Sequence, residues 1–446
     1  MAKVNMKANE MAANEMVCLI LETRQLQEAI DRVATCAEGG LYTLYVQNRV
    51  RNFQTTAGQV SMTRCILVAT CATAQAMASV YATVRTFKDG APAGEGVDTT
   101  LEVTLQKEFA ADIAACEGFP QVVIGISAAG IRVQAQNAEN DEREFFIALS
   151  DEAPARFSNK GGSESLELTV PGQEFAETVM FAAAGVYSPD KGGNIISFIP
   201  EISQKGTELV CVGFDQHGAA RASVKVKEVG DDHDTLRAFF TGFCPVDARR
   251  LQVITSVEGL KGDADSSVKI RFFQDLNGEK RLFRRMDLLI GENAYMLVAS
   301  SREIPAAILS FFGNGKSNTV MTVDVKALAK AIGVAEIGAG KTAAVTIMVD
   351  GAGEGAGLRI SDKSGTHNAK CMKVKVTEAP EGATITCGTG MLRNALKNAG
   401  DSAEFRFCYG TADPIRLTNV KGWQAVFMPV VLKDEAEPSE KAEKTE

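Results

Sequence analysis

The sequence is poor in histidine and tryptophan, with three and one in 446 residues. Its ten cysteines are scattered, and no two of them form a CxxC pair. Structural zinc sites need closely spaced Cys and His ligands, so this spacing excludes the common zinc motifs. Most of the cysteines lie within apolar runs, as small core residues do, which predicts reduced thiols. We therefore expect no metal and no cofactor.

Long apolar segments are also missing. No stretch approaches the roughly 18 apolar residues of a membrane helix, and the N-terminal MAKVNMKANEMAANEM has no apolar signal-peptide core. We expect a cytoplasmic protein that does not contact membranes. Residues 1–15 are predicted to form a disordered extension. Residues 433–446, which contain no apolar residue except alanine, are predicted to form an acidic disordered tail.

The sequence does contain a repeated strand–helix unit. Residues 325–333 (VKALAKAIG) align with residues 392–400 (LRNALKNAG), each with a helical apolar stripe and a final Gly typical of a left-handed helix end. Residues 101–105 (LEVTL) likewise match residues 166–170 (LELTV) as alternating strands. Such repetition predicts a modular protein. Each repeat opens with a strand that leads directly into a helix, which we call a strand–helix opening. These openings begin near residues 17, 100, 166, 240, 319 and 383.

About three amphipathic strands follow each of these helices. This pattern predicts an α+β fold with helices on one face of antiparallel sheet. The alanine-rich Ala72–Val84 is predicted as an inserted helix. Pairing the six units gives three domains, with boundaries at the Gly/Ser-rich Asn159–Ser165 and at Gly313–Asn318. The predicted domains are residues 16–160, 161–316 and 317–432.

Two stretches imitate a phosphate-binding loop, namely Gly313–Ser317 and Gly338–Thr342. The motif needs an additional Gly five residues before the second one, and Ser310 and Ala335 stand there instead. The second stretch also follows a helix and precedes a strand, which reverses the required order. We therefore predict ordinary loops rather than nucleotide sites.

The sequence around the histidines does not indicate a catalytic or metal site. His217 lies two residues from Asp215, but no Ser or Cys nucleophile occurs in a strained strand–turn–helix context. His233 lies in a polar GDDHD stretch that we read as a solvated loop without a second ligand set. We predict that the protein is not an enzyme. A hydrolase using His217 and Asp215 remains a lesser alternative.

Basic residues occur on five of the six predicted repeat helices. Two of these helices carry the same i, i+4 basic pair, which indicates a common surface for an anionic partner. Contacts to phosphate groups would be salt-sensitive and independent of base sequence, and the formal charge of −9 does not exclude them. The third helix, Gln173–Val186, has Glu174 and Glu177 and no basic residue. The basic residues are Arg24, Arg32, Lys107, Arg249, Arg250, Lys326, Lys330, Arg393 and Lys397.

Several motifs occur in the order and spacing of one known family. Val426–Leu432 is an apolar strand followed by Met-Pro and a short apolar end. Asp413–Ile415 is similar to a Ser-Pro-Val strand, Phe214–Ala219 to a Thr-Asp-Gly-His-Arg-Leu turn, and Ile304–Leu309 to a Phe-Pro-x-Tyr segment. Together they resemble the bacterial-type DNA sliding clamp, the β subunit of the replicative polymerase.

This resemblance covers residues 16 to 432 and implies a processivity factor for DNA replication. It implies a head-to-tail homodimer that closes three domains per chain into a ring around double-stranded DNA. Helices, and the nine basic residues on them, would line the interior, with sheets outside. The replicative polymerase and the clamp loader would dock in a peptide-binding groove. The groove residues would be Phe214, His217, Gly218, Ala219, Pro305, Leu309, Ile415, Val426, Phe427, Met428, Pro429 and Val430.

The sequence also departs from the family pattern. Gly218 and Ala219 replace Arg-Leu, and Gln216 replaces Gly. We therefore expect a divergent clamp, of a kind that a phage could encode, whose groove accepts different peptides. A non-ring repeat scaffold for protein–protein interaction, with solvated basic faces, is the alternative.

Overall fold

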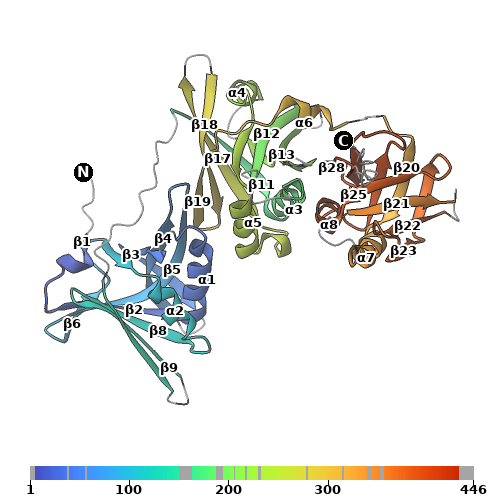
Figure 1. Ribbon diagram of the computed structural model, residues 1–446. Coiled ribbons are helices and arrows are strands. Elements are labelled where there is room, and N and C mark those ends of the chain that lie inside the picture. Colours follow the sequence, from blue (N-terminus) through green and yellow to red (C-terminus); the bar gives the residue numbers. More distant parts are fainter. Residues whose placement is uncertain are drawn as a thin grey trace, which may run out of the picture. The chain divides into compact units, whose positions relative to one another are not determined.

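The chain forms two compact units, drawn in Figure 1 as a computed structural model. Unit 1 comprises Met1–Gln173, Val226–Val246 and Val253–Ser300, and unit 2 comprises Glu174–Lys225, Asp247–Gln252 and Ser301–Glu446. The described residues are 6–430 without 38–39, 56–57, 138, 140, 150–162, 187–193, 205, 216–217, 230–232, 278–279, 314–315, 339–343 and 352–355. His217, most of the second loop resembling a phosphate site and the predicted tail at 433–446 therefore lie outside the described residues.

All six predicted strand–helix openings are present, which confirms the α+β class. The fourth begins later than predicted, because residues 233–239 form a separate helix, α4 (His233–Phe239). His233, expected in a loop, is thus the first residue of a helix. The openings are β2 (Glu15–Glu22) with α1 (Thr23–Ala34), β7 (Leu101–Leu105) with α2 (Glu108–Ala114), β11 (Glu164–Pro171) with α3 (Gly172–Ala183), β16 (Cys244–Asp247) with α5 (Ala248–Val257), β20 (Thr319–Asp324) with α7 (Val325–Glu336), and β25 (Thr384–Gly388) with α8 (Thr389–Lys397).

The two helices that repeat each other end differently from the prediction. Helix α7 continues through Gly333 to Glu336, because Ala335 extends the buried stripe of the helix by another turn. Asp324 caps its start by accepting a hydrogen bond from the Ala327 amide at 2.8 Å. Helix α8 starts at Thr389, before the aligned residues. Of the two glycines predicted to end these helices, Gly400 has a positive φ, of 86°, and Gly333 does not. Figure 1 shows α7 and α8 packed together beside the strands of this last pair.

Two sequence predictions for unit 1 were wrong. The alanine-rich Ala72–Val84 is not a helix but most of β5 (Ala74–Lys88), whose residues alternate between buried and half-buried up to Val84. Period-two burial outweighs the helix propensity of alanine here. The predicted disordered extension is ordered from Met6 onward. There β1 (Met6–Lys7) pairs in parallel with β7, and Met11 is buried.

Within a pair of repeats, the opening strands exchange partners. The strand after each helix pairs with the opening strand of the other repeat, so β2 pairs with β8, β7 with β3, β20 with β26, and β25 with β21, all antiparallel. The exchange makes each repeat depend on its neighbour for a complete sheet. The strands involved are β3 (Tyr42–Thr55), β8 (Gln121–Ser127), β21 (Ala344–Asp350) and β26 (Ser402–Phe407).

Sheets also continue from one pair of repeats to the next. In unit 1, β5 pairs with β19 (Asn293–Val298) in antiparallel register, with Ala74 opposite Leu297. In unit 2, β14 (Gly218–Lys225) pairs with β28 (Gln424–Phe427), with Gly218 opposite Phe427. Each of these four strands is the third after its repeat helix. The third strand therefore joins one pair of repeats to the next.

Candidate nucleic-acid surface and peptide groove

The basic residues of α1 have carboxylate partners. Arg24 is exposed and forms an ion pair with Glu28 at 3.0 Å. Arg32 is only 23% exposed, lying 3.5 Å from Glu28 and 3.6 Å from Glu258. Lys107, predicted on a helix, instead precedes the first residue of α2 and is exposed. Arg32 is therefore held by the protein itself rather than presented freely.

Glu258 is the centre of a buried polar cluster that the sequence analysis missed. Its side chain is 5% exposed, and the Asn293 amide donates to both carboxylate oxygens, at 3.0 and 3.2 Å. The Tyr295 hydroxyl also donates to Glu258. Burial and the Glu258 charge raise the pKa of Tyr295 well above its usual value, so this hydroxyl keeps its proton. The cluster anchors α1 to β19 within unit 1.

In unit 2, each repeated basic pair contains one partnered and one unpartnered residue. Lys326 on α7 lies 3.0 Å from Asp401, whose hydrogen bond and charge raise the lysine pKa. Arg393 on α8 pairs with Glu336 at the end of α7. Lys330 and Lys397 are exposed and have no ion-pair partner among the residues that the structure describes. These two are the freest cations of the pairs.

Arg249 and Arg250 lie in the first turn of α5. The Arg250 amide donates to Asp247 Oδ1 at 2.8 Å, which caps the helix. Arg249 is exposed. In the part of α5 that belongs to unit 2, the Gln252 side chain reaches Met180 Sδ of α3 at 3.9 Å. This contact places α3 beside the first turns of α5.

The acidic helix α3 is accompanied by a lysine from elsewhere in the chain. Lys421 Nζ lies 2.5 Å from Glu177 Oε2 and 4.7 Å from the centre of the Trp423 ring. Asn398, just after α8, donates to the Met180 carbonyl of α3 at 3.3 Å. Helix α3 therefore lies beside α8, and the turn before β28 supplies the positive charge that α3 lacks.

The predicted peptide-groove residues of β14 and β28 come together. Ala219 pairs with Val426, and Phe427 pairs with both Gly218 and Ile415. Met428 follows and is 42% exposed. Phe214 ends β13 (Gly206–Phe214), opposite Ala219.

Pro305 precedes the short helix α6 (Ala306–Ser310), and Leu309 lies within it. The residues after α6 contact the same hairpin as the groove residues. The Phe311 carbonyl accepts from Arg416 Nε at 3.3 Å, and the Gly313 amide donates to Gln424 at 3.0 Å. The segment after α6 therefore contacts β27 (Ile415–Asn419) and β28.

Gly218 is required by close packing. A Cβ at this position would lie 2.4 Å from the Val426 carbonyl oxygen and 2.8 Å from the methyl carbon of Met391. Met391, on α8, therefore lies beside a predicted groove residue, and the sequence had not indicated this contact. Asp215 Oδ1 accepts from the Gly218 amide at 3.1 Å, so the carboxylate of the alternative dyad bonds the first residue of β14.

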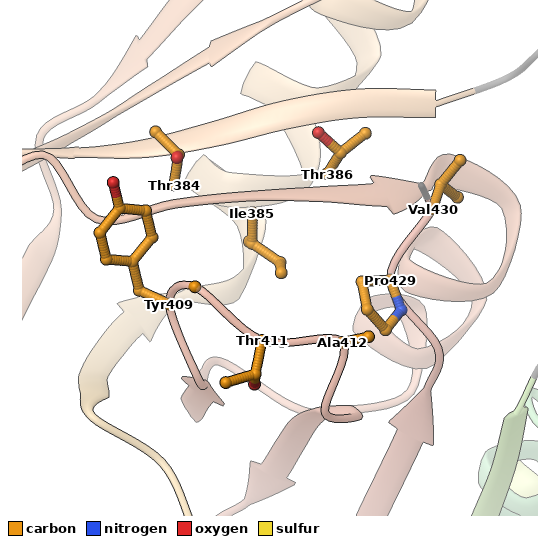
Figure 2. Close-up of a pocket in the computed structure, with 9 residues that line it drawn as sticks. Thr384, Ile385, Thr386, Tyr409, Thr411, Ala412, Pro429 and Val430 are labelled. Atoms are coloured by element: carbon orange, nitrogen blue, oxygen red, sulfur yellow. The ribbon is translucent and has the colours of Figure 1, made fainter. Parts of the chain in front are cut away.

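A cavity of about 330 Å³ lies next to Pro429 and Val430 (Figure 2). One wall is β25, and the other is the loop that precedes β27 and carries Tyr409. In Figure 2 the Tyr409 ring extends toward Thr384, and Ile385 points into the space between the walls. The cavity is lined by Thr384, Ile385, Thr386, Tyr409, Gly410, Thr411, Ala412, Pro429 and Val430.

The described residues provide no sign of metal chemistry or of a membrane span. Among them, no group of three or more His, Cys, Asp or Glu side chains is arranged to hold a metal ion. No helix in the described part of the chain has both the length and the apolar character needed to cross a membrane.

No family model matches the chain, and no curated protein matches its sequence. Solved structures do match. The β sliding clamp of Caulobacter crescentus, solved with PEG bound, is 16% identical with a TM-score of 0.65, over 94% of this chain and 100% of that one. The DNA polymerase III β subunit of Thermotoga maritima is 13% identical with a TM-score of 0.65, over 93% of this chain and 100% of that one. The DNA polymerase sliding clamp of Pseudomonas aeruginosa is 14% identical with a TM-score of 0.66, with the same coverage. The chain therefore has the fold of the bacterial DNA polymerase III β sliding clamps.

Proposed function

We propose that this protein is a DNA polymerase processivity factor, a sliding clamp that encircles duplex DNA and tethers the replicative polymerase. The observation that carries the proposal is the fold match, which spans 93–94% of this chain and all of each solved clamp. The three domains at 16–160, 161–316 and 317–432 belong to the proposal, as does a cytoplasmic location. The clamp acts by topology, so no catalytic group is needed.

The pairing of third strands supports assembly as a head-to-tail homodimer. Within the chain, the third strand after one repeat helix pairs with the third strand of a neighbouring pair of repeats, as β5 does with β19 and β14 with β28. Two third strands remain without such a partner among the described residues, β10 (Glu142–Ile147) in the first pair and β23 (Asn368–Cys371) in the last. Both are edge strands with an exposed apolar side chain at or next to them, Phe146 at 65% and Met372 at 63%. Pairing β23 of one copy with β10 of the next would repeat the internal joint and cover both edges.

Contacts to DNA would come from the basic residues of the repeat helices. Such contacts reach phosphates, so they bind without reading base sequence and permit sliding. Carboxylate partners on Arg24, Arg32, Lys326 and Arg393 weaken their attraction for phosphate. We infer that Lys330, Lys397, Arg249 and Lys107 carry more of the contact.

The groove around Gly218, Val426 and Met428 would hold peptides of the polymerase and of the clamp loader. A polymerase tethered there stays at high effective concentration at the primer end without any new contact to DNA. The non-ring scaffold is the second candidate, and it shares the groove but not the ring.

Retention on DNA tests the function. After loading by a clamp loader, the protein should remain on nicked circular DNA and slide off the same DNA once it is linearised. Equal retention on both forms would overturn the ring and favour the scaffold. Light scattering should give twice the 47.5 kDa mass of the chain in the absence of DNA.

A further inference from the structure

The outer edge of an opening strand, which faces away from the exchanged partner, is covered in a regular way. In five of the six repeats, the chain that continues from the third strand covers the opening strand of its own repeat. The second half of β5 pairs with β2, β15 (Glu228–Val229) after β14 pairs with β11, and β24 (Val374–Glu378) after β23 pairs with β20. The chain after β19 bonds β16, and the chain after β28 bonds β25, through one amide each. The third strand and the cover are thus one continuous piece of chain in these repeats.

The second repeat of the first pair is the exception. Its third strand, β10, ends at Ile147, and among the described residues no backbone bond from the chain after it reaches β7. The edge of β7 is covered by β1 instead, with Met6 opposite Leu101. The Met6 amide also donates to the Thr100 carbonyl at 3.0 Å. The cover and the third strand are separate pieces of chain here, so the cover can detach while the third strand stays paired.

The covering segment, residues 6–14, is called the N-terminal strap below. After β1 it forms a short 3-10 helix, η1 (Ala8–Glu10), which contacts both β7 and β8. Ala8 and Met11 are buried, at 3% and 6% exposure. The end of the strap is fastened by Asn14, whose side chain donates to Asp89 Oδ1 and whose carbonyl accepts from the Asp89 amide, both at 2.9 Å. The strap is therefore held by two buried side chains and a few hydrogen bonds.

The strap connects two branches of the sheet in unit 1. One branch runs from β7 through β3 and β4 to β5, and the other runs from β5 through β2, β8 and β9 (Gly130–Gln136) to β10. The branches meet at β5, and at the far side the strap contacts β7 of one and β8 of the other. The branch that the strap fastens ends in β10, the strand that we propose to pair between copies.

We propose that the N-terminal strap is a detachable fastener that controls assembly of the two copies. With the strap in place, the branch that carries β10 is held against β7 and presents its edge in a fixed position to β23 of the next copy. When the strap leaves, this branch loses its second attachment and the edge of β7 is bare, so the joint between copies weakens. The proposal rests on the proposed homodimer and adds a segment that regulates it.

Sedimentation of full-length variants over a dilution series tests the strap. Met11→Asp places a charge at a buried position and should release the strap, which should raise the dimer Kd about tenfold or more. Ala12→Asp is the matched control, because it places the same charge on the exposed neighbouring residue and should leave the dimer Kd unchanged. A synthetic peptide of residues 1–14 should bind the Met11→Asp variant but not the wild type, whose own strap fills the edge, and should restore the dimer. Failure of the peptide to restore the dimer would overturn the proposal.

Hydrogen exchange shows directly whether the strap is released. The amides of residues 6–11 and 100–105 should exchange slowly in the wild type and in Ala12→Asp, and faster in Met11→Asp. Faster exchange in Met11→Asp with an unchanged dimer Kd would overturn the role of the strap and leave the ring in place. A wild type that is monomeric throughout the dilution series would instead refute the homodimer itself, so the two failures are distinguished.

Discussion

The guanidinium of Arg32 lies 3.6 Å from the buried carboxylate of Glu258, which also accepts from Asn293 and Tyr295. This ion pair joins α1 to Glu258, the residue that follows α5, within unit 1. The carboxylate is almost fully withdrawn from water, so its partners determine whether its charge is tolerated.

Replacing Glu258 should therefore destabilise unit 1. Glu258→Ala leaves Arg32 with less compensation and removes the acceptor of two buried donors, so we expect a loss of about 3–5 kcal/mol in the free energy of unfolding. Arg24→Ala, which breaks an exposed pair on the same helix, should change it by less than about 1 kcal/mol. Urea unfolding followed by circular dichroism measures both. Similar losses for the two variants would refute the structural role of Glu258.

The unpartnered lysines should matter more for DNA than their partnered neighbours. Lys330→Ala with Lys397→Ala should lower the slope of log affinity against log salt by roughly 0.9 for each phosphate that is no longer neutralised. Lys326→Ala with Arg393→Ala should lower it less, because Asp401 and Glu336 already neutralise these residues. Charge reversal, Lys326→Glu with Arg393→Glu, should weaken DNA retention while the dimer persists. Unchanged retention in all three variants would remove these helices from the DNA surface.

Assembly should depend on the two open third strands. Phe146→Asp and Met372→Asp each place a charge at an edge that we propose to pair between copies, so each should give a 47.5 kDa monomer by light scattering. Val420→Asp is the matched control, because Val420 is 78% exposed in the turn between β27 and β28 and belongs to neither edge strand. Dimers in both edge variants would exclude these strands from the interface.

Asp287 should make stability depend on pH. Burial raises its pKa to about 6 despite Arg285, whose Nε lies 2.6 Å away. The unfolded pKa is about 3.9, so the folded state holds this proton more tightly. The resulting contribution, roughly 3 kcal/mol, is present below about pH 4 and is lost as the pH rises through 6.

Urea unfolding of wild type and Asp287→Asn between pH 4 and 7 tests this dependence. The variant cannot ionise at this position, so its free energy of unfolding should fall less over this range, although it is less stable overall. Parallel pH profiles of the two proteins would contradict the raised pKa.

Removing the end of the chain should separate assembly from partner binding. Deleting Met428–Glu446 leaves β28 and its pairing with β14 intact, because β28 ends at Phe427. The truncated protein should form dimers but no longer stimulate the polymerase. Full stimulation would remove the groove from the proposal.

The sequence by itself determined the six strand–helix openings and their buried faces. Alternation in Leu101–Leu105 and the stripe of Val325–Glu336 are local patterns, and burial follows them directly. It indicated the ends of elements less well, since α7 continues past Gly333. A glycine can sit inside a helix when the next residues continue the apolar stripe.

Only the tertiary structure decided which elements meet. The exchange of opening strands, the cover of β7 by Met6–Lys7, the burial of Glu258 beside Arg32 and the contact of Met391 with Gly218 all join residues distant in sequence. Periodicity specifies which side of an element is apolar but not the partner that covers it. That choice depends on long-range packing, which also gave Lys326 and Arg393 carboxylate partners and left Lys330 and Lys397 with none among the described residues.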